Sequence, residues 1–490
     1  MSDEKDISYE EDVKKTTITT TSTSDEVQVE TETTEKSEEE KEYLRKLNWI
    51  VLPFAGMTIF LNFCDKSALS VGPVLGLNAD LGLTGQEFSL LGSLFYLGHL
   101  VYQLPNQFML QRVPHARYLG VLLCIWGLVM TLTALTQNFA QMAACRFLLG
   151  LFEAAAMPTL YLVTSILYRR SEQTLVFGFI TLCNGVGAAV GSAIAYGIAH
   201  MGHPNGIQNW RWNHYIFGAL TILHGFIVYF FMVDTPKHKK LKLTPAEERI
   251  ADARMKDNAV TQHREFKYAQ IWECLKEARW YLLVIAAFCI SMQNGGMLVY
   301  STTFTMALGF SPLDSMLLQI PSGFASSLGV LAAMLIARKT GQLLYTGIGL
   351  LIIGMIGLVL LCAIPEGEVK LLGFYLSWAG TGAYSLLLTY VGNNAKGYTK
   401  KIFYNGCIVA AYTLGNFAGP LMMVEHEAPR YLSGVGGYLA GFGVAAIAFL
   451  IVRIQAARTN KKRIANGAVG DVNLALDLTD QEDEQFLYRV

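Results

Sequence analysis

Long runs of apolar residues, separated by short polar stretches, make up most of the chain between residues 47 and 457. A helix needs about 20 mostly apolar residues to cross the hydrocarbon core of a bilayer. By that measure the pattern predicts twelve membrane-spanning helices. Their ranges are 47–69, 88–110, 117–136, 140–168, 174–199, 213–233, 281–304, 313–337, 342–364, 371–392, 402–424 and 433–457.

The longest polar interruption, residues 234–279, divides these spans into six before it and six after it. Within it, Thr244 is placed to cap a helix and Pro245 to open one. We therefore expect a short surface helix in this linker and no thirteenth span. The predicted fold is an all-α membrane protein with six-helix halves at 47–233 and 280–457, a layout typical of the major facilitator fold.

Composition agrees with this fold, because 52% of the residues are hydrophobic, only 16% are charged and the mean hydropathy is +0.34. The net charge of −1 gives no reason to expect nucleic acid as a partner. No P-loop, GxSxG, HExxH or Rossmann motif occurs, so we expect neither an enzyme nor an ATP-driven pump, and no cofactor. The eight cysteines lack CxxC spacing, and His200, His203 and His214 lack acidic or Cys companions, so no metal site is predicted.

The two ends of the chain differ from its apolar middle. Residues 1–46 hold fifteen acidic and seven basic residues and are too polar to offset the entropy of ordering, which predicts a disordered acidic tail. Most Lys and Arg residues fall in this tail, in the linker, in alternate short loops and in the second tail, 458–490. The positive-inside rule then places both termini in the cytoplasm. We expect a monomer in the lipid bilayer.

Four ionisable residues interrupt the apolar spans at membrane depth: Asp65 and Lys66 in the first span, and Arg146 and Glu153 in the fourth. Such groups are costly in a bilayer and usually mark ion or substrate pathways. Seven residues of helix place Arg146 and Glu153 on one face, about 10 Å apart. Asp65 and Lys66 are adjacent, so we expect one of them to face the fourth span and the other to face different helices.

The four charges sum to zero, which suggests how they would work. Arg146 offers a planar fork suited to carboxylate or sulfonate oxygens, and Lys66 would add a second positive charge. An incoming anion would unbalance the site, and a proton on Glu153 or Asp65 would restore neutrality. The alternative role for each acid–base pair is to lock two helices together.

Polar residues in the second span provide further candidates for substrate binding. Tyr96, His99 and Gln103 follow helical spacing on one face. His99 would bind substrate, relay protons or be a buried histidine with satisfied hydrogen bonds.

The second half offers amide and aromatic candidates. Residues 293–296 contain two glycines that we expect to interrupt the seventh span, where Asn294 could reach a ligand; flexibility near a gate is the alternative. Tyr384, Tyr412 and Asn416 lie in the tenth and eleventh spans. Aromatic residues there could equally serve packing.

Several motifs together give the chain a family resemblance. They are DKSAL at 65–69, LGLTGQ at 81–86, RFLLGLFEA at 146–154, YRRSEQ at 168–173, KGYTKK at 396–401, GNFAGP at 415–420 and DLTD at 477–480. On these residues the chain resembles the fungal allantoate permease family, the anion:cation symporter branch of the major facilitator superfamily. The resemblance runs from about residue 45 through nearly all of the remaining chain.

The resemblance implies proton-coupled uptake of small carboxylates or related anions across the plasma membrane. It also implies that Asp65, Lys66, Arg146 and Glu153 serve coupling and anion binding. The chain departs from the family pattern at Lys66, where Arg is frequent, at His99, where Tyr is frequent, and at 102–107. The substrate stays open among allantoate, ureides, nicotinate, pantothenate, thiol amino acids and sulfonates, and a facilitator, an anion exchanger or a non-transporting nutrient sensor are the alternatives.

Overall fold

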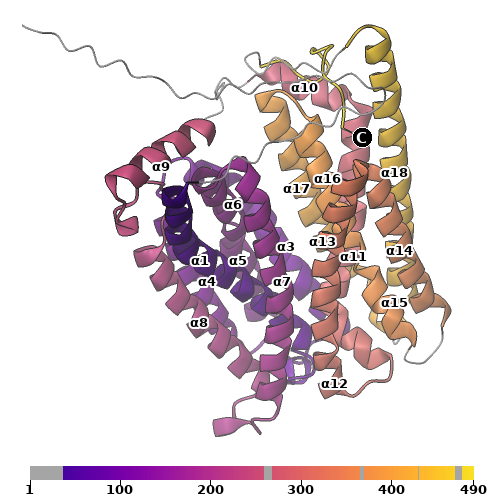
Figure 1. Cartoon of the computed structure of the whole chain (residues 1–490). Helices are drawn as coiled ribbons and strands as arrows, with labels where there is room; N and C mark the ends of the chain where they lie inside the picture. Colours follow the sequence, from indigo (N-terminus) through magenta and orange to yellow (C-terminus); the bar gives the residue numbers. More distant parts are fainter. Residues whose placement is uncertain (1–36, 259–266, 365–368, 429, 469–476, 490) are drawn as a thin grey trace, which may run out of the picture.

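Two six-span helical halves lie side by side in the computed structural model (Figure 1), which describes residues 37–258, 267–364, 369–428, 430–468 and 477–489. Those residues contain helices and turns but no strand. Judged by length and composition alone, ten of the spans are long and apolar enough to cross a membrane. The other two, α3 and α17, are the more polar spans two and eleven. The predicted all-α, twelve-span fold is confirmed.

The first half comprises six spans and one short helix. They are α1 (Glu38–Val71), the short α2 (Leu77–Leu81), α3 (Gly85–Leu110), α4 (His115–Thr133), α5 (Phe139–Glu153) with α6 (Ala156–Leu167), α7 (Arg170–Ala199) and α8 (Asn209–Phe231).

Two linker helices precede the second half, α9 (Pro245–Asn258) and α10 (Tyr268–Lys276). The six spans that follow are α11 (Ala278–Ala307), α12 (Pro312–Leu317) with α13 (Gln319–Thr340), α14 (Leu343–Ala363), α15 (Val369–Ser377) with α16 (Gly380–Asn394), α17 (Tyr398–Leu421) and α18 (Leu432–Ala465). We call the end of the bundle with α9 and α10 the linker face and the end with α12 the far face (Figure 1).

Three spans that read as continuous apolar runs are each broken into two helices. The break between α5 and α6 precedes Pro158, and the break between α12 and α13 precedes Pro321. Proline lacks an N–H and its ring clashes with the carbonyl four residues earlier, so each of these two breaks falls three or four residues before its proline. The third break lies between α15 and α16 and has no proline behind it. The first of these breaks places Glu153 at the very end of α5.

The seventh span is not interrupted, which corrects the expectation for residues 293–296. Helix α11 runs unbroken through these residues. A Cβ on Gly295 would lie 2.4 Å from the backbone oxygen of Asn416, and one on Gly296 would lie 1.7 Å from the hydroxyl of Tyr438. The two glycines therefore allow α17 and α18 to pack closely on α11, and they do not break the helix.

The first helix begins earlier than its apolar run, so residues 38–46 are not part of a disordered tail; residues 1–36 lie outside the described part of the chain. Ser37 caps α1 by accepting a hydrogen bond from the Glu40 N–H. Glu40 also pairs with Arg254 of α9 at 2.7 Å. A good cap and ion pairs to the linker therefore compensate for the low hydrophobicity of this first turn.

The linker helix α9 opens at Pro245, the expected residue. The Thr244 hydroxyl accepts from the Glu247 N–H at 3.3 Å, and the Glu247 carboxylate accepts from the Thr244 N–H at 2.7 Å. This reciprocal cap satisfies two N–H groups at the start of the helix.

Helices α3 and α5 touch through their backbones, and this contact fixes where Glu153 lies. A Cβ on Gly150 would be 1.8 Å from the carbonyl oxygen of Phe95. We expect Gly150→Ala to push the two helices apart and to destabilise the protein by about 1–3 kcal/mol or more, the usual effect of overpacking. Thermal unfolding of the purified protein in detergent measures this.

The matched control is Gly178→Ala in α7, because a Cβ at Gly178 would meet nothing within 4 Å. That variant should unfold at the wild-type temperature or slightly above it, since Ala favours a helix. Equal behaviour of the two variants would contradict the close contact.

Candidate functional site

A cavity of about 290 Å³ lies between the two halves. Its walls come from α1, α3, α6 and α7 in the first half and from α11, α13, α16 and α17 in the second, with Trp378 at the break between α15 and α16. Ser70 and Ser301 lie in its lining and share a hydrogen bond of 2.6 Å near the far-face ends of α1 and α11. Ser89 and Tyr300 join the halves nearby at 2.5 Å. These contacts close the far-face end of the cavity.

Only part of the predicted set of site residues lines this cavity. The lining residues among them are Lys66, Tyr96, Asn294, Tyr384 and Tyr412. The others, which lie behind the lining or along helix contacts, are Asp65, Arg146, Glu153, His99, Gln103 and Asn416.

Lys66 connects the cavity to the buried charges. Its ammonium group lies 3.0 Å from a carboxylate oxygen of Glu153 and donates to the Asn62 side chain at 2.7 Å. The Lys66 side chain keeps 20% of its surface exposed, whereas that of Glu153 keeps 1%. An anion in the cavity can therefore reach Lys66, and in doing so it competes with Glu153 for the same positive charge.

Asp65 and Arg146 form a second, fully enclosed pair. Their closest oxygen and nitrogen are 3.9 Å apart, and their side chains are 0% and 2% exposed. The Trp126 indole N–H of α4 donates to the other Asp65 oxygen at 2.8 Å. Arg146 does not line the cavity, so a direct contact with substrate, the role expected from its guanidinium fork, has no support in this arrangement.

Both charges of the first span face the fourth span, which differs from the expectation that one of them would turn elsewhere. Adjacent residues point about 100° apart on a helix, but Arg146 and Glu153 are two turns apart along α5. The two diverging side chains of α1 therefore each meet a partner on the same neighbouring helix. The result is two opposite-sign pairs and no net charge.

Aromatic side chains of the second half form the opposite wall. The rings of Tyr384 and Tyr412 are 4.7 Å apart and inclined by 31°. Asn416 is buried and donates to the Tyr412 carbonyl at 2.8 Å, so its N–H group serves its own helix.

The remaining candidates of the second span are used in helix contacts. Gln103 donates to the Thr413 hydroxyl across the halves at 3.0 Å, and its amide nitrogen lies 3.4 Å from the His99 ring. Gln103 therefore joins α3 to α17, and His99 lies beside it on α3.

A wall of hydroxyl and amide groups also lines the cavity and was not predicted from the sequence. Many lie one helical turn apart, as Ser322 and Ser326 do, and that spacing is the signal that could have revealed them. The missed polar lining residues are Ser67, Ser70, Tyr161, Thr181, Asn184, Ser192, Ser291, Ser301, Gln319, Ser322, Ser326, Ser327, Thr381 and Ser385. Of the described residues that line the cavity, Lys66 alone is charged.

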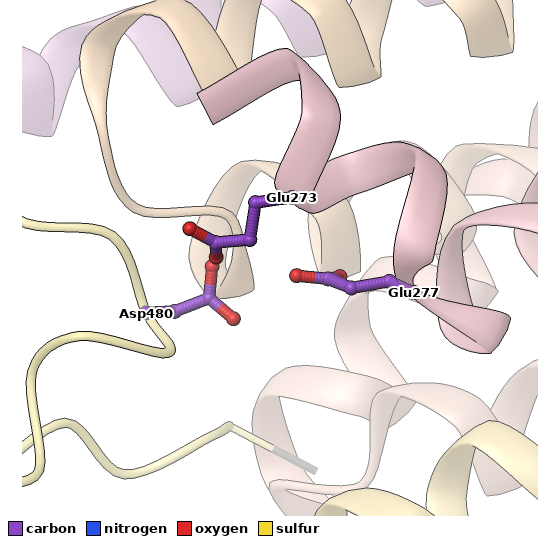
Figure 2. A group of neighbouring side chains, drawn as sticks. All are labelled: Glu273, Glu277 and Asp480. Carbon is purple, nitrogen blue, oxygen red and sulfur yellow. The ribbon is translucent and has the colours of Figure 1, made fainter. Parts of the chain in front are cut away.

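A second group of ionisable side chains lies at the linker face. Figure 2 shows Glu273, Glu277 and Asp480 gathered together, and one carboxylate oxygen of each lies within 4.8 Å of one oxygen of the other two. The Lys400 ammonium is 2.6 Å from Glu273 and 2.8 Å from Asp480, and it also bonds Glu277. A lysine thus occupies the position that a metal ion would need, and its charge would repel one.

The sequence profile of the Major Facilitator Superfamily matches residues 55–420. An uncharacterized transporter of Schizosaccharomyces pombe is 29% identical over 92% of this chain and 90% of its own length. The allantoate permease of Saccharomyces cerevisiae is 28% identical, with coverages of 92% and 87%, and the thiamine pathway transporter of that yeast is 25% identical with the same coverages.

Solved structures share the fold. A bacterial homolog of the human lysosomal transporter Spinster, in an inward-facing and unoccupied conformation, has a TM-score of 0.63 at 16% identity, covering 82% of this chain and 96% of that one. A D-xylose–proton symporter has a TM-score of 0.61 at 16% identity, with coverages of 84% and 97%.

Proposed function

The chain belongs to the major facilitator superfamily, and from this premise we propose that it is a proton-coupled symporter that imports a small organic anion by alternating access. We place it in the plasma membrane as a monomer of the allantoate permease family with both termini in the cytoplasm. The far face is then the outer side and the linker face the inner side.

The observation that carries the proposal is the Lys66–Glu153 ion pair at the edge of the central cavity. A carboxylate or sulfonate in the cavity takes the place of Glu153 at the Lys66 ammonium. Glu153 is then left buried without a counter-ion, which is costly in low dielectric, so it binds a proton. Anion and proton therefore enter together, and the occupied site keeps the neutral charge of the empty one.

The Asp65–Arg146 pair supports this role from behind the cavity. Its net charge is zero, so it leaves Lys66 and Glu153 as the two groups that set the charge balance at the cavity. Asp65 is the second carboxyl group that could accept a proton, because at 3.9 Å Arg146 stabilises its ionised form less than a close ion pair would.

The lining also indicates the kind of anion. A single cation among hydroxyl and amide groups favours a monoanion with several hydrogen-bonding groups over a compound with two or three charges. A ureido carboxylate has this character, and the allantoate permease among the relatives agrees with it.

The test is uptake into liposomes that contain the purified protein, with labelled allantoate as the monoanionic probe and labelled succinate as the dianionic one. We expect allantoate to accumulate above its equilibrium level when the outside is acidic, and a protonophore to abolish the excess. Succinate should stay near background. Allantoate uptake that only equilibrates, with or without the pH gradient, would show a facilitator, and preference for succinate would contradict the monoanion assignment.

A further inference from the structure

The C-terminal residues 477–489 turn back onto the linker face of the second half, and we call this segment the strap. It lies near α10 and the linker-face ends of α17 and α18 (Figure 1). Thr479 and Asp480 within it are both 0% exposed. A polar segment that buries a carboxylate completely must find specific partners for it.

Asp480 has such partners on three sides. It pairs with Lys400 of α17 at 2.8 Å and with Arg279 of α11 at 2.7 Å, and it accepts from the Tyr488 hydroxyl at 2.7 Å. Burial by itself would raise the pKa of Asp480, but the charges of Arg279 and Lys400 outweigh burial and hold the pKa below its ordinary value. Asp480 is therefore ionised at neutral pH and closes the cluster of Figure 2 around Lys400.

The strap also caps the start of α17. The residue before this helix is Gly397, which has no side chain to accept from the first N–H groups. Asp477 of the strap accepts from the Tyr398 N–H at 2.7 Å, and Gln270 of α10 accepts from the Lys400 N–H at 3.0 Å. The cap of span eleven thus comes from other parts of the chain.

The backbone of the strap is held by side chains of two further helices. Asn394 of α16 exchanges two hydrogen bonds with the Arg489 backbone, at 2.8 and 2.7 Å. Asn460 of α18 does the same with the Tyr488 backbone, at 2.8 and 2.8 Å. Arg463, also of α18, donates to the Asp480 carbonyl at 2.7 Å. On the linker face of the second half, side chains of α16 and α18 therefore bind the backbone of the strap.

We propose that the strap is a detachable clamp, which holds the start of α17 against α10 when docked and uncovers Cys274 when released. The contacts described above are ion pairs and hydrogen bonds, which water can replace one by one, so release need not unfold the bundle. Release removes the Asp477 part of the cap of α17, the helix that also carries the cavity-lining residue Tyr412. This inference does not depend on the proposed transport function.

Cys274 reports on the docked state. It lies in α10 with 0% of its surface exposed. Burial raises the pKa of its thiol to about 12, so few molecules carry the reactive thiolate at neutral pH while the strap is docked. Gln270 and Glu277 lie one helical turn before and after Cys274. Gln270 donates to Asp477 of the strap at 3.3 Å, and Gln481 of the strap donates to Glu277 at 2.7 Å, so the strap passes over the turn of α10 that carries this thiol.

The experiment measures the rate at which N-ethylmaleimide labels Cys274 in the full-length protein, read by peptide mass spectrometry. Asp480→Asn removes the charge that pairs with Lys400 and Arg279, and we expect labelling at least ten times faster than in the wild type. Hydrogen exchange at residues 398–401 should rise in the same variant. The matched control is Glu484→Gln, an equal charge change at an exposed strap residue, which should stay within twofold of the wild type.

Cys64, buried in α1, serves as an internal measure of folding. If Asp480→Asn also exposes Cys64, the variant has unfolded. The test then rests on the labelling of Cys274 in Asn460→Ala, because that variant removes only the two hydrogen bonds to Tyr488. Protection of Cys274 at the wild-type level in folded Asp480→Asn and in Asn460→Ala would overturn the proposal. An equal increase in Glu484→Gln would overturn it as well.

Discussion

Replacing Glu153 by glutamine is expected to abolish proton-driven accumulation of the anion while leaving exchange of labelled for unlabelled anion across the membrane. Glutamine keeps the size of the side chain but is always neutral, so it resembles the protonated carboxyl group. Lys66 then stays free for the anion, and binding requires no proton. Without a proton that must enter and leave with the anion, the gradient cannot drive uptake.

The measurement compares net accumulation under an imposed pH gradient with exchange at equal pH, in the same liposomes. Glu248→Gln, an exposed residue of the linker helix α9, is the control for the loss of one negative charge and should behave as the wild type. Full accumulation by Glu153→Gln would remove Glu153 from the coupling mechanism. Loss of both exchange and accumulation would point to a structural role for the Lys66–Glu153 pair.

Replacing Arg146 by alanine is expected to cost about 3–5 kcal/mol of stability, the usual effect of removing one partner from a buried ion pair. The Asp65 carboxylate is 0% exposed, and without Arg146 it would keep the hydrogen bond from the neutral Trp126 indole but lose its ion-pair partner. We expect a large fall in the unfolding temperature and little protein in the membrane. Because Arg146 does not line the cavity, we expect the main effect of the change to be on stability and not on substrate recognition.

The chain contains a matched control for this variant. Asp80 accepts from the Trp210 indole N–H at 2.8 Å and pairs with Arg211 at 2.9 Å, as Asp65 does with Trp126 and Arg146, but the Arg211 and Asp80 side chains are 18% and 23% exposed. Water can reach this pair after the change, so Arg211→Ala should cost less than Arg146→Ala, about 1–2 kcal/mol, even though the hydrogen bond from Arg211 to the Ala134 carbonyl is lost as well. Adding Asp65→Asn to Arg146→Ala should restore much of the folded protein. A stable Arg146→Ala single variant with normal uptake would show that the pair is dispensable.

The twelve spans and the two halves could be predicted from the sequence because each is a local property. A run of about 20 apolar residues must cross the bilayer as a helix, wherever its neighbours lie. Thr244 and Pro245 gave the start of α9 for the same reason, since a helix cap involves only a few consecutive residues. The expected interruption at 293–296 was wrong because the two glycines make room for Asn416 and Tyr438, which are far away in the sequence.

The sequence by itself determined that Asp65, Lys66, Arg146 and Glu153 lie at membrane depth, because they stand inside apolar runs. Only the tertiary structure decided that Lys66 pairs with Glu153 and reaches the cavity, while Arg146 pairs with Asp65 and does not. It likewise decided that Asp480 closes a cluster around Lys400, eighty residues earlier in the chain. Pairing and exposure depend on how distant helices cross and rotate, and helical periodicity within one segment carries no information about its partner.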